Sequence, residues 1–187
     1  MYRIVNKMTF PDDLEILTMI EQPALKDAGY RLLVGKYKEK LYWHIRRMVD
    51  HHDDADDILQ NTFIKVVRSL NGFQQQSTLY TWMYRIATNE SLNFIKSKKS
   101  KYSESLDNLQ LEDVRDSQYF DESSALNHLK TAINALPEKQ KLVFNLRYYD
   151  EMPYQEIADI TETSVGALKA SYHHAVKKIE EHLKATV

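Results

Sequence analysis

Apolar residues recur at intervals of three and four along almost the whole of this 187-residue chain. The clearest case is the stripe formed by Val165, Leu168, Tyr172, Val176, Ile179 and Leu183. Such spacing places side chains on one face of an α-helix, whereas a half-buried strand would alternate. The chain has only four Gly and four Pro, too few for a turn-rich sandwich or barrel. We therefore expect an all-α fold.

The same spacing and the usual boundary residues predict where the helices lie. Pro23 ends the first helix, Asn71-Gly72 ends the third, and Ser164 caps the last one. Pro137 and Pro153 suit the first turns of two further helices. The predicted helices cover 12–20, 24–49, 53–70, 78–97, 126–136, 137–146, 154–160 and 164–183.

Residues 102–124 break this pattern. Seven acidic side chains stand there against Arg115 alone, and no helical period is sustained. Acidic, aperiodic segments of this kind cannot bury enough apolar surface to fold on their own. We therefore predict two small helical domains, 1–100 and 125–187, joined by a flexible acidic linker at 101–124.

The second domain has the outline of a helix-turn-helix: a short helix, a three-residue turn and a longer capped helix. If the apolar stripe of the last helix faces the core, its other face points outward. That outward face carries Gly166, Lys169, Ala170, His173 and Lys177. The start of such a face meets base edges in the major groove, and Arg147 could hold a flanking phosphate. The alternative is a solvated helix face without a partner.

Charge and cysteine content narrow the possible functions. The formal net charge is −2, so nucleic acid would have to be bound by local patches rather than by bulk charge. One such patch is 71–101, where five basic side chains face only Glu90. The absence of Cys excludes disulfides, thiolate zinc sites and a cysteine nucleophile. No apolar run suits a signal peptide or a membrane span, so we expect a cytoplasmic protein without membrane insertion.

An enzyme is not expected. The pairs His51-His52 and His173-His174 are adjacent in sequence, and neighbouring residues on a helix diverge rather than chelate one ion. There is no phosphate-binding glycine loop and no nucleophile elbow. We predict no catalytic residue, no metal and no cofactor.

Five ordered segments carry a resemblance to a known family. They are DADDILQNTF at 54–63, YTWMYRIATN at 80–89, LPEKQ at 136–140, YQEIA at 154–158 and SVGALK at 164–169. Together they resemble bacterial RNA polymerase sigma factors of the extracytoplasmic-function type, within the sigma-70-like family. The resemblance runs from Ala24 to Leu183 and leaves the first 20 residues unassigned.

The resemblance implies that the helix over 54–63 binds core RNA polymerase, at a coiled-coil of its largest subunit. The implied residues are Asp56, Asp57, Gln60 and Asn61. We expect Asp56, Asp57 and Gln60 to lie on the side of the helix away from Phe63. The acidic first turn also has a simpler interpretation, because acids at a helix N-terminus are favoured by the helix dipole.

The resemblance also implies that a polar loop and the following helix open the promoter and read its minus-ten element. Opening DNA requires a pocket for an unstacked base and cations for the phosphates. The implied residues are Phe73, Gln74, Gln75, Gln76, Ser77, Thr78, Asn89, Asn93 and Lys96. Tyr80 and Trp82 could stack on bases, but for Trp82 we favour burial.

The second domain resembles the part of sigma factors that reads the minus-thirty-five element and contacts the flap of the second polymerase subunit. The implied DNA contacts are Arg147, Gly166, Lys169, Ala170, His173, His174 and Lys177. The segment 170–174 departs from the family, which usually has more arginine there, so fewer fixed positive charges would reach the groove.

These expectations define the predicted function: a sigma factor that binds core polymerase and promoter DNA, both double-stranded and melted, and starts transcription. An anti-sigma factor is an expected partner. The acidic linker is either a soluble spacer or, as in the family, a segment that lies in the polymerase's RNA path. The alternative function is a helix-turn-helix regulator that does not engage polymerase.

Overall fold

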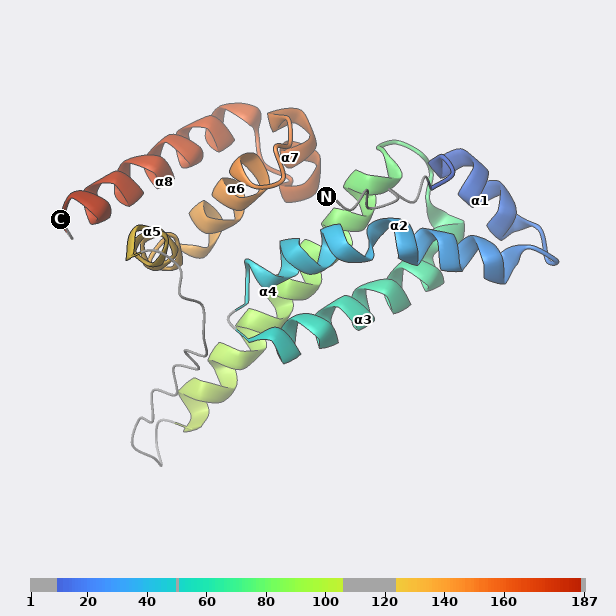
Figure 1. Cartoon of the computed structure of the whole chain (residues 1–187), viewed down its shortest axis with the longest axis horizontal. Coiled ribbons are helices and arrows are strands. Elements are labelled where there is room, and N and C mark those ends of the chain that lie inside the picture. Colours follow the sequence, from blue (N-terminus) through green and yellow to red (C-terminus); the bar gives the residue numbers. More distant parts are fainter. Residues whose placement is uncertain (1–9, 50, 106–123, 186–187) are drawn as a thin grey trace, which may run out of the picture.

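The computed structural model describes residues 10–49, 51–105 and 124–185, and every regular element in these ranges is a helix. This agrees with the all-α prediction (Figure 1). The elements are α1 (Asp13–Glu21), α2 (Lys26–Arg46), α3 (His52–Ser69), the 3-10 turn η1 (Leu70–Gly72), α4 (Leu79–Ser105), α5 (Ser124–Asn134), α6 (Glu138–Tyr148), α7 (Tyr154–Thr161) and α8 (Val165–Ala185).

The N-terminal domain is built from α1 to α4, with α2 lying against α1, α3 and α4. Its core is formed by one face of each helix, including Ile16, Leu33, Ile45, Val66 and Met83, which are almost fully buried. Leu59 and Val66 form part of the buried face of α3, and Leu79, Met83 and Ala87 form the inward face of α4. Trp82 is half-buried against Phe73, with 5.1 Å between their ring centroids.

Helix α1, which lies in the part without family resemblance, is fastened to α2. A capping box at Asp12 and Glu15 starts it. Asp13 then accepts hydrogen bonds or ionic contacts from Tyr37 at 2.6 Å and Lys36 at 2.8 Å. Gly29 permits the close crossing, since a Cβ atom there would lie 2.7 Å from Cγ1 of Ile20.

The C-terminal domain is built from α5 to α8, with α8 contacting each of the other three helices. Ser164 caps α8 as predicted, since its Oγ accepts a hydrogen bond from the Ala167 amide at 3.3 Å. A small cluster around Ile133, Phe144 and Ile179 joins α5, α6 and α8. The spacing of Leu126, Leu129, Ile133 and Leu136 predicts a buried stripe on α5, but Leu126 lies in the first turn of that helix and is half exposed.

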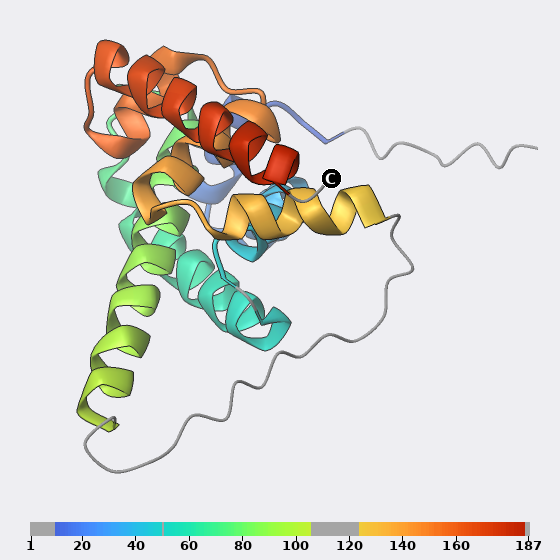
Figure 2. The ribbon, with the colours of Figure 1, turned by 90° about the vertical axis from the view of Figure 1, so that its left-hand side faces the viewer.

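The two domains are not separate bodies in this structure. Leu142, Leu146, Met152 and Ile157 of the second domain belong to the same buried cluster as the core of the first. Helix α7 lies directly against α4. Figures 1 and 2, which view the molecule from directions 90° apart, both show α6 and α7 seated beside the N-terminal half of α4.

The connection between the domains is shorter than the sequence indicates. Helix α4 continues through Ser105, past the expected end near Ser97, so the first five positions of the predicted linker are helical. The rest of that segment, 106–123, and residues 1–9 lie outside the described residues.

Candidate functional site

A groove on the outer face of α3 holds two of the residues assigned to polymerase binding. Asp56 and Gln60 line it together with Leu59, Phe63, Ile64, Val67 and Arg68 of α3 and Val34 and Lys38 of α2. We call this the α3 groove; its volume is about 550 Å³. Asp57 and Asn61 are exposed on the same helix but do not line the groove.

The α3 groove combines apolar surface with hydrogen-bond acceptors. Ile64 and Val67 are each 40% exposed, unusually open for their residue types. The expectation that Asp56 and Gln60 point away from Phe63 is wrong: all three line the groove, because positions four and seven apart share one helix face. Ile64 and Val67 were missed, although apolar residues off the buried stripe are a sequence signal for such a surface.

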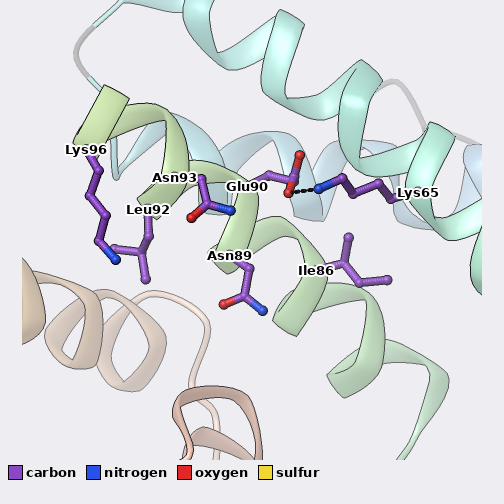
Figure 3. Close-up of a pocket in the computed structure, with 7 residues that line it drawn as sticks. All are labelled: Lys65, Ile86, Asn89, Glu90, Leu92, Asn93 and Lys96. Carbon is purple, nitrogen blue, oxygen red and sulfur yellow. Dashed lines mark hydrogen bonds and ion pairs between the residues drawn. The ribbon is translucent and has the colours of Figure 1, made fainter. Parts of the chain in front are cut away.

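A second depression lies along α4 and contains three of the residues assigned to the minus-ten element. Asn89, Asn93 and Lys96 are exposed and line it with Ile86, Leu92, Glu90 and Lys65. Figure 3 shows Lys65 reaching across from α3 to Glu90, at 2.5 Å, beside the two asparagines. We call this the α4 pocket. Its amides can donate and accept hydrogen bonds, and Lys96 supplies positive charge, whereas the charge of Lys65 is balanced by Glu90.

The loop 73–78 precedes α4 and is mostly exposed. Gln74, Gln75 and Gln76 extend into solvent, and Gln75 has a left-handed backbone with φ of 55°. Gln76 donates to Gln74 at 3.0 Å. The Thr78 hydroxyl accepts from the Thr81 amide at 3.1 Å, so Thr78 is the N-terminal cap of α4.

The outward face of α8 is fully open. The predicted residues Gly166, Lys169, Ala170, His173, His174 and Lys177 are all exposed. A Cβ atom on Gly166 would meet nothing within 4 Å, so the helix start presents bare backbone. This is the geometry that a recognition helix needs to enter a major groove.

Arg147 of α6 is held beside that face rather than free in solution. Its Nη1 donates to the Met152 carbonyl at 2.9 Å, and its guanidinium lies 5.2 Å from the centroid of the Tyr154 ring. Lys169 lies over the same ring at 5.9 Å. Tyr154 therefore brings the two cations of α6 and α8 together.

Sequence reasoning missed the polar contacts between the domains. Arg47, at the end of α2, donates to Asp150 at 2.8 Å and lies 4.6 Å from the centroid of the Tyr149 ring. Buried His44 places Nδ1 3.5 Å from the other oxygen of Asp150, and its Nε2 is 2.9 Å from the Thr88 hydroxyl. These partners are 103 residues apart, and no sequence pattern links them.

Three buried tyrosines of the N-terminal domain have raised pKa values, and charges of the domain contact contribute for two of them, Tyr80 and Tyr84. Burial, followed by the negative charge of Asp150, raises the pKa of Tyr84 far above its usual value. Burial likewise raises the pKa of Tyr80. For Tyr37 burial is again the largest cause, and its hydrogen bond to Asp13 adds to the rise in pKa. All three phenols therefore stay protonated in the folded protein.

The histidine pairs considered for metal binding have other neighbours. His52 lies 3.2 Å from Asp53 and 3.1 Å from Asp56, on the exposed start of α3. His173 and His174 have ring centroids 5.9 Å apart. Across the described parts of the chain, no three His, Asp or Glu side chains gather as metal ligands would. Nor does any helix there have the length and apolar character to cross a bilayer.

Comparison with known proteins matches the two domains to two parts of one family. The pattern of Sigma-70 region 2 matches residues 33–101, and that of Sigma-70 region 4 matches residues 126–179. The chain is 30% identical over 167 residues to an ECF RNA polymerase sigma-E factor of Haemophilus influenzae, covering 83% of this chain and 88% of that one. It is 28% identical over 174 residues to the RNA polymerase sigma-H factor of Pseudomonas aeruginosa, covering 83% and 86%.

The fold has solved counterparts. A sigma factor RpoE, crystallised with the anti-sigma factor NepR from Bartonella quintana, superposes with a TM-score of 0.69 at 23% identity, covering 83% of this chain and 96% of that one. CnrH, in complex with the cytosolic domain of CnrY, gives the same TM-score at 18% identity, covering 94% and 100%. Sigma factors are initiation factors rather than enzymes. With region 2, region 4 and a relative matched along most of its length, the chain belongs to the extracytoplasmic-function sigma factors, which direct promoter recognition and transcription initiation.

Proposed function

We propose that this sigma factor divides its work among three surfaces, of which the α3 groove binds core RNA polymerase. Asp56, Asp57, Gln60 and Asn61 would accept hydrogen bonds from a basic coiled-coil of the largest subunit. The observation that carries this proposal is the exposure of Ile64 and Val67 beside these acceptors. An apolar centre with a polar rim is how protein interfaces are commonly built.

The second surface, the α4 pocket with the loop 73–78, takes the minus-ten element as it opens. Asn89, Asn93 and the three glutamines offer donors and acceptors to the edge of an unstacked base. Lys96 supports the phosphates of the exposed strand. Phe73 packs behind the loop against Trp82, so its role is to fix the loop rather than to stack on DNA.

The third surface is the exposed face of α8. We assign Gly166, Lys169, Ala170, His173, His174 and Lys177 to the major groove of the minus-thirty-five element, and Arg147 to a flanking phosphate. The open start of α8 and the pairing of Arg147 with Lys169 over Tyr154 support this assignment. The same domain would contact the flap of the second polymerase subunit.

An anti-sigma factor is the expected regulatory partner, because both structural counterparts were solved with a bound protein, named as an anti-sigma factor for the first. The protein would act in the bacterial cytoplasm, where polymerase and promoters are.

The experiment on the first surface measures binding to core polymerase. Asp57→Lys combined with Gln60→Lys should weaken the complex while the helical content is unchanged. Glu21→Lys combined with Gln22→Lys is the matched control, because it makes the same chemical change on an exposed end of α1. Wild-type affinity in the α3 variant would contradict the proposal. These residues would then only be solvated side chains near the start of α3, where acidic groups are favoured by the helix dipole. A wild-type protein that forms no complex at all would leave the helix-turn-helix regulator as the remaining function.

A further inference from the structure

We propose that region 4 closes over region 2 as an autoinhibitory cover, in which carboxylate and carbonyl oxygens of α6, α7 and the loop between them occupy cations that bind promoter phosphates once the cover opens. This inference rests on the proposed function, but the contact itself can be tested without DNA. The groups involved come from two faces, one on each domain.

The face on region 2 is cationic and polar. We call it the α2–α4 face, and it consists of Arg47, Thr81, Arg85 and Lys99. Each of these side chains ends on an oxygen atom of region 4. None was assigned to a promoter element by the sequence, although Arg85 and Lys99 lie on the helix that opens DNA.

The face on region 4 is anionic where it meets these groups. Asp150 accepts from Arg47 at 2.8 Å, and Glu156 accepts from Thr81 at 3.5 Å. Arg85 donates to the carbonyl of Asp159, and Lys99 donates to Glu138. Carboxylates and carbonyls thus take the positions that phosphate oxygens would take around three cations.

The contact is well formed but incompletely satisfied. Apolar side chains join the two domains in one cluster, yet Arg85 Nε and Asn145 Oδ1 are buried in the contact without a hydrogen bond. His44 Nδ1 and Asp150 Oδ2 also lack a hydrogen bond, and they face each other at 3.5 Å. Buried polar atoms without a good partner destabilise an interface. This destabilisation lowers the free energy needed to separate the domains and suits an interface that opens.

The geometry of a promoter requires that opening. As their names indicate, the minus-ten and minus-thirty-five elements are centred about 25 base pairs apart. At a rise of about 3.4 Å per base pair, this separation is about 85 Å. Helices α4 and α8, even laid end to end, would span only about 70 Å at 1.5 Å per residue. In the closed form α7, which leads directly into α8, touches α4. The closed form therefore cannot hold both elements of straight DNA.

Distances between labels test the closure. The chain has no Cys, so Ser69→Cys and Lys178→Cys, both at exposed positions, give one spin label on each domain. Pulsed electron paramagnetic resonance should find one narrow distance distribution in this background. Adding Glu138→Gln, Asp150→Asn and Glu156→Gln should broaden it and move it to longer distances. Arg47→Gln, which breaks the central pair from the other side, should do the same.

The matched control is Asp13→Asn. It removes an ion pair of 2.8 Å between Lys36 of α2 and Asp13 of α1, wholly within the N-terminal domain, and should leave the distances unchanged. A broad distance distribution in the doubly labelled protein without further substitutions would overturn the proposal. So would an unchanged distribution in the triple variant, provided that its helical content and melting temperature show a folded protein.

Affinity for a forked promoter fragment tests the inhibition. The triple variant should bind about 3- to 10-fold more tightly than the wild type, and Asp13→Asn should bind as the wild type does. Longer distances with no gain in affinity would refute the inhibitory role. If no variant bound the fork, the proposed DNA-binding function would fail, whereas the label distances would still decide whether the domains close.

Discussion

Two faces of region 2 differ in polarity and in whether region 4 covers them. The α3 groove is apolar at its centre and open, with Ile64 and Val67 exposed. The α2–α4 face is charged and covered, with Arg47 and Arg85 held by region 4. Given the roles proposed for these faces, we expect an order of events: the free sigma factor would bind polymerase first, and the covered cations would become available to DNA only after the domains separate.

The largest effect is expected at the open face. Ile64→Asp combined with Val67→Asp should weaken binding to core polymerase on the order of 100-fold or more, because central apolar contacts each carry about 2 kcal/mol or more. Binding can be measured by titrating labelled sigma factor with core enzyme. Leu14→Asp, at a 65% exposed position on α1, is the control for adding an acid to the surface. Equal losses in both proteins would remove the groove from the interface.

The folded protein should lose stability at high pH. Tyr37 and Tyr84 are buried, and their pKa values are raised in the folded state. Unfolded tyrosine ionises near pH 10, so above that pH only the unfolded chain releases these protons. Each such group lowers the free energy of unfolding by about 1.4 kcal/mol per pH unit, and the loss continues until the folded pKa is reached. Below pH 10 the contribution is fully present.

Denaturant unfolding between about pH 9 and pH 11.5 measures this loss. Tyr84→Phe should reduce the dependence of the unfolding free energy on pH by the contribution of one ionising group. Tyr148→Phe, on the exposed surface, should leave this dependence unchanged. Because Asp150 adds to the raised pKa of Tyr84, Asp150→Asn should lower the alkaline midpoint for that tyrosine. An identical slope in wild type and Tyr84→Phe would show that Tyr84 is not buried as described.

The two promoter surfaces should be separable. Asn93→Ala should weaken binding to the minus-ten element by about 1–3 kcal/mol, and Lys169→Ala should weaken binding to duplex carrying the upstream element. If Lys169 contacts a phosphate, Lys169→Ala should reduce the number of ions released on binding to the upstream element by about one. This number is measured as the slope of log affinity against log salt concentration. Asn71→Ala and Lys184→Ala, both at exposed positions, are the matched controls. Equal weakening of the same fragment by both variants would contradict the two-surface proposal.

Local structure was largely predictable from the sequence, whereas the contact between the domains was not. The stripe on α8, its cap at Ser164 and the helix starts at Glu138 and Tyr154 all follow from short-range rules, and the structure confirms them. The left-handed Glu162 that ends α7 could not be anticipated, because the usual signal for that conformation is glycine.

The contact between the two domains could not be predicted from the sequence for a different reason. Summed over 125–187, the charges of region 4 cancel. In three dimensions they separate: acids on α6, α7 and the loop between them face region 2, and Lys169 and Lys177 are exposed on α8. A net charge along the chain cannot report such a division, because it depends on which face each helix turns inward. The orientation of α3 was unknown for the same reason, so the sequence did not predict that Asp56 and Phe63 line one groove.

The smallest effect is expected from the two histidines on the otherwise lysine-bearing face of α8. Histidine side chains in general gain a positive charge as pH falls from about 7.5 to about 6. His173 is exposed, one turn from Lys169 and Lys177 and next to His174, so its neighbours on this face are cationic or neutral. A phosphate in the groove would favour the charged form of an imidazole beside it.

Binding to the upstream element should therefore strengthen by about 2- to 3-fold over that pH range, since one exposed charge contributes well under 1 kcal/mol. His173→Gln keeps a hydrogen-bonding side chain but removes the charge, so it should flatten the trend without abolishing binding. His128→Gln, on α5 and away from α8's outward face, controls for other titrating groups. A trend that persists in His173→Gln but disappears in His174→Gln would assign the phosphate contact to the neighbouring ring, and a trend that persists in both would place the titrating group outside the recognition face.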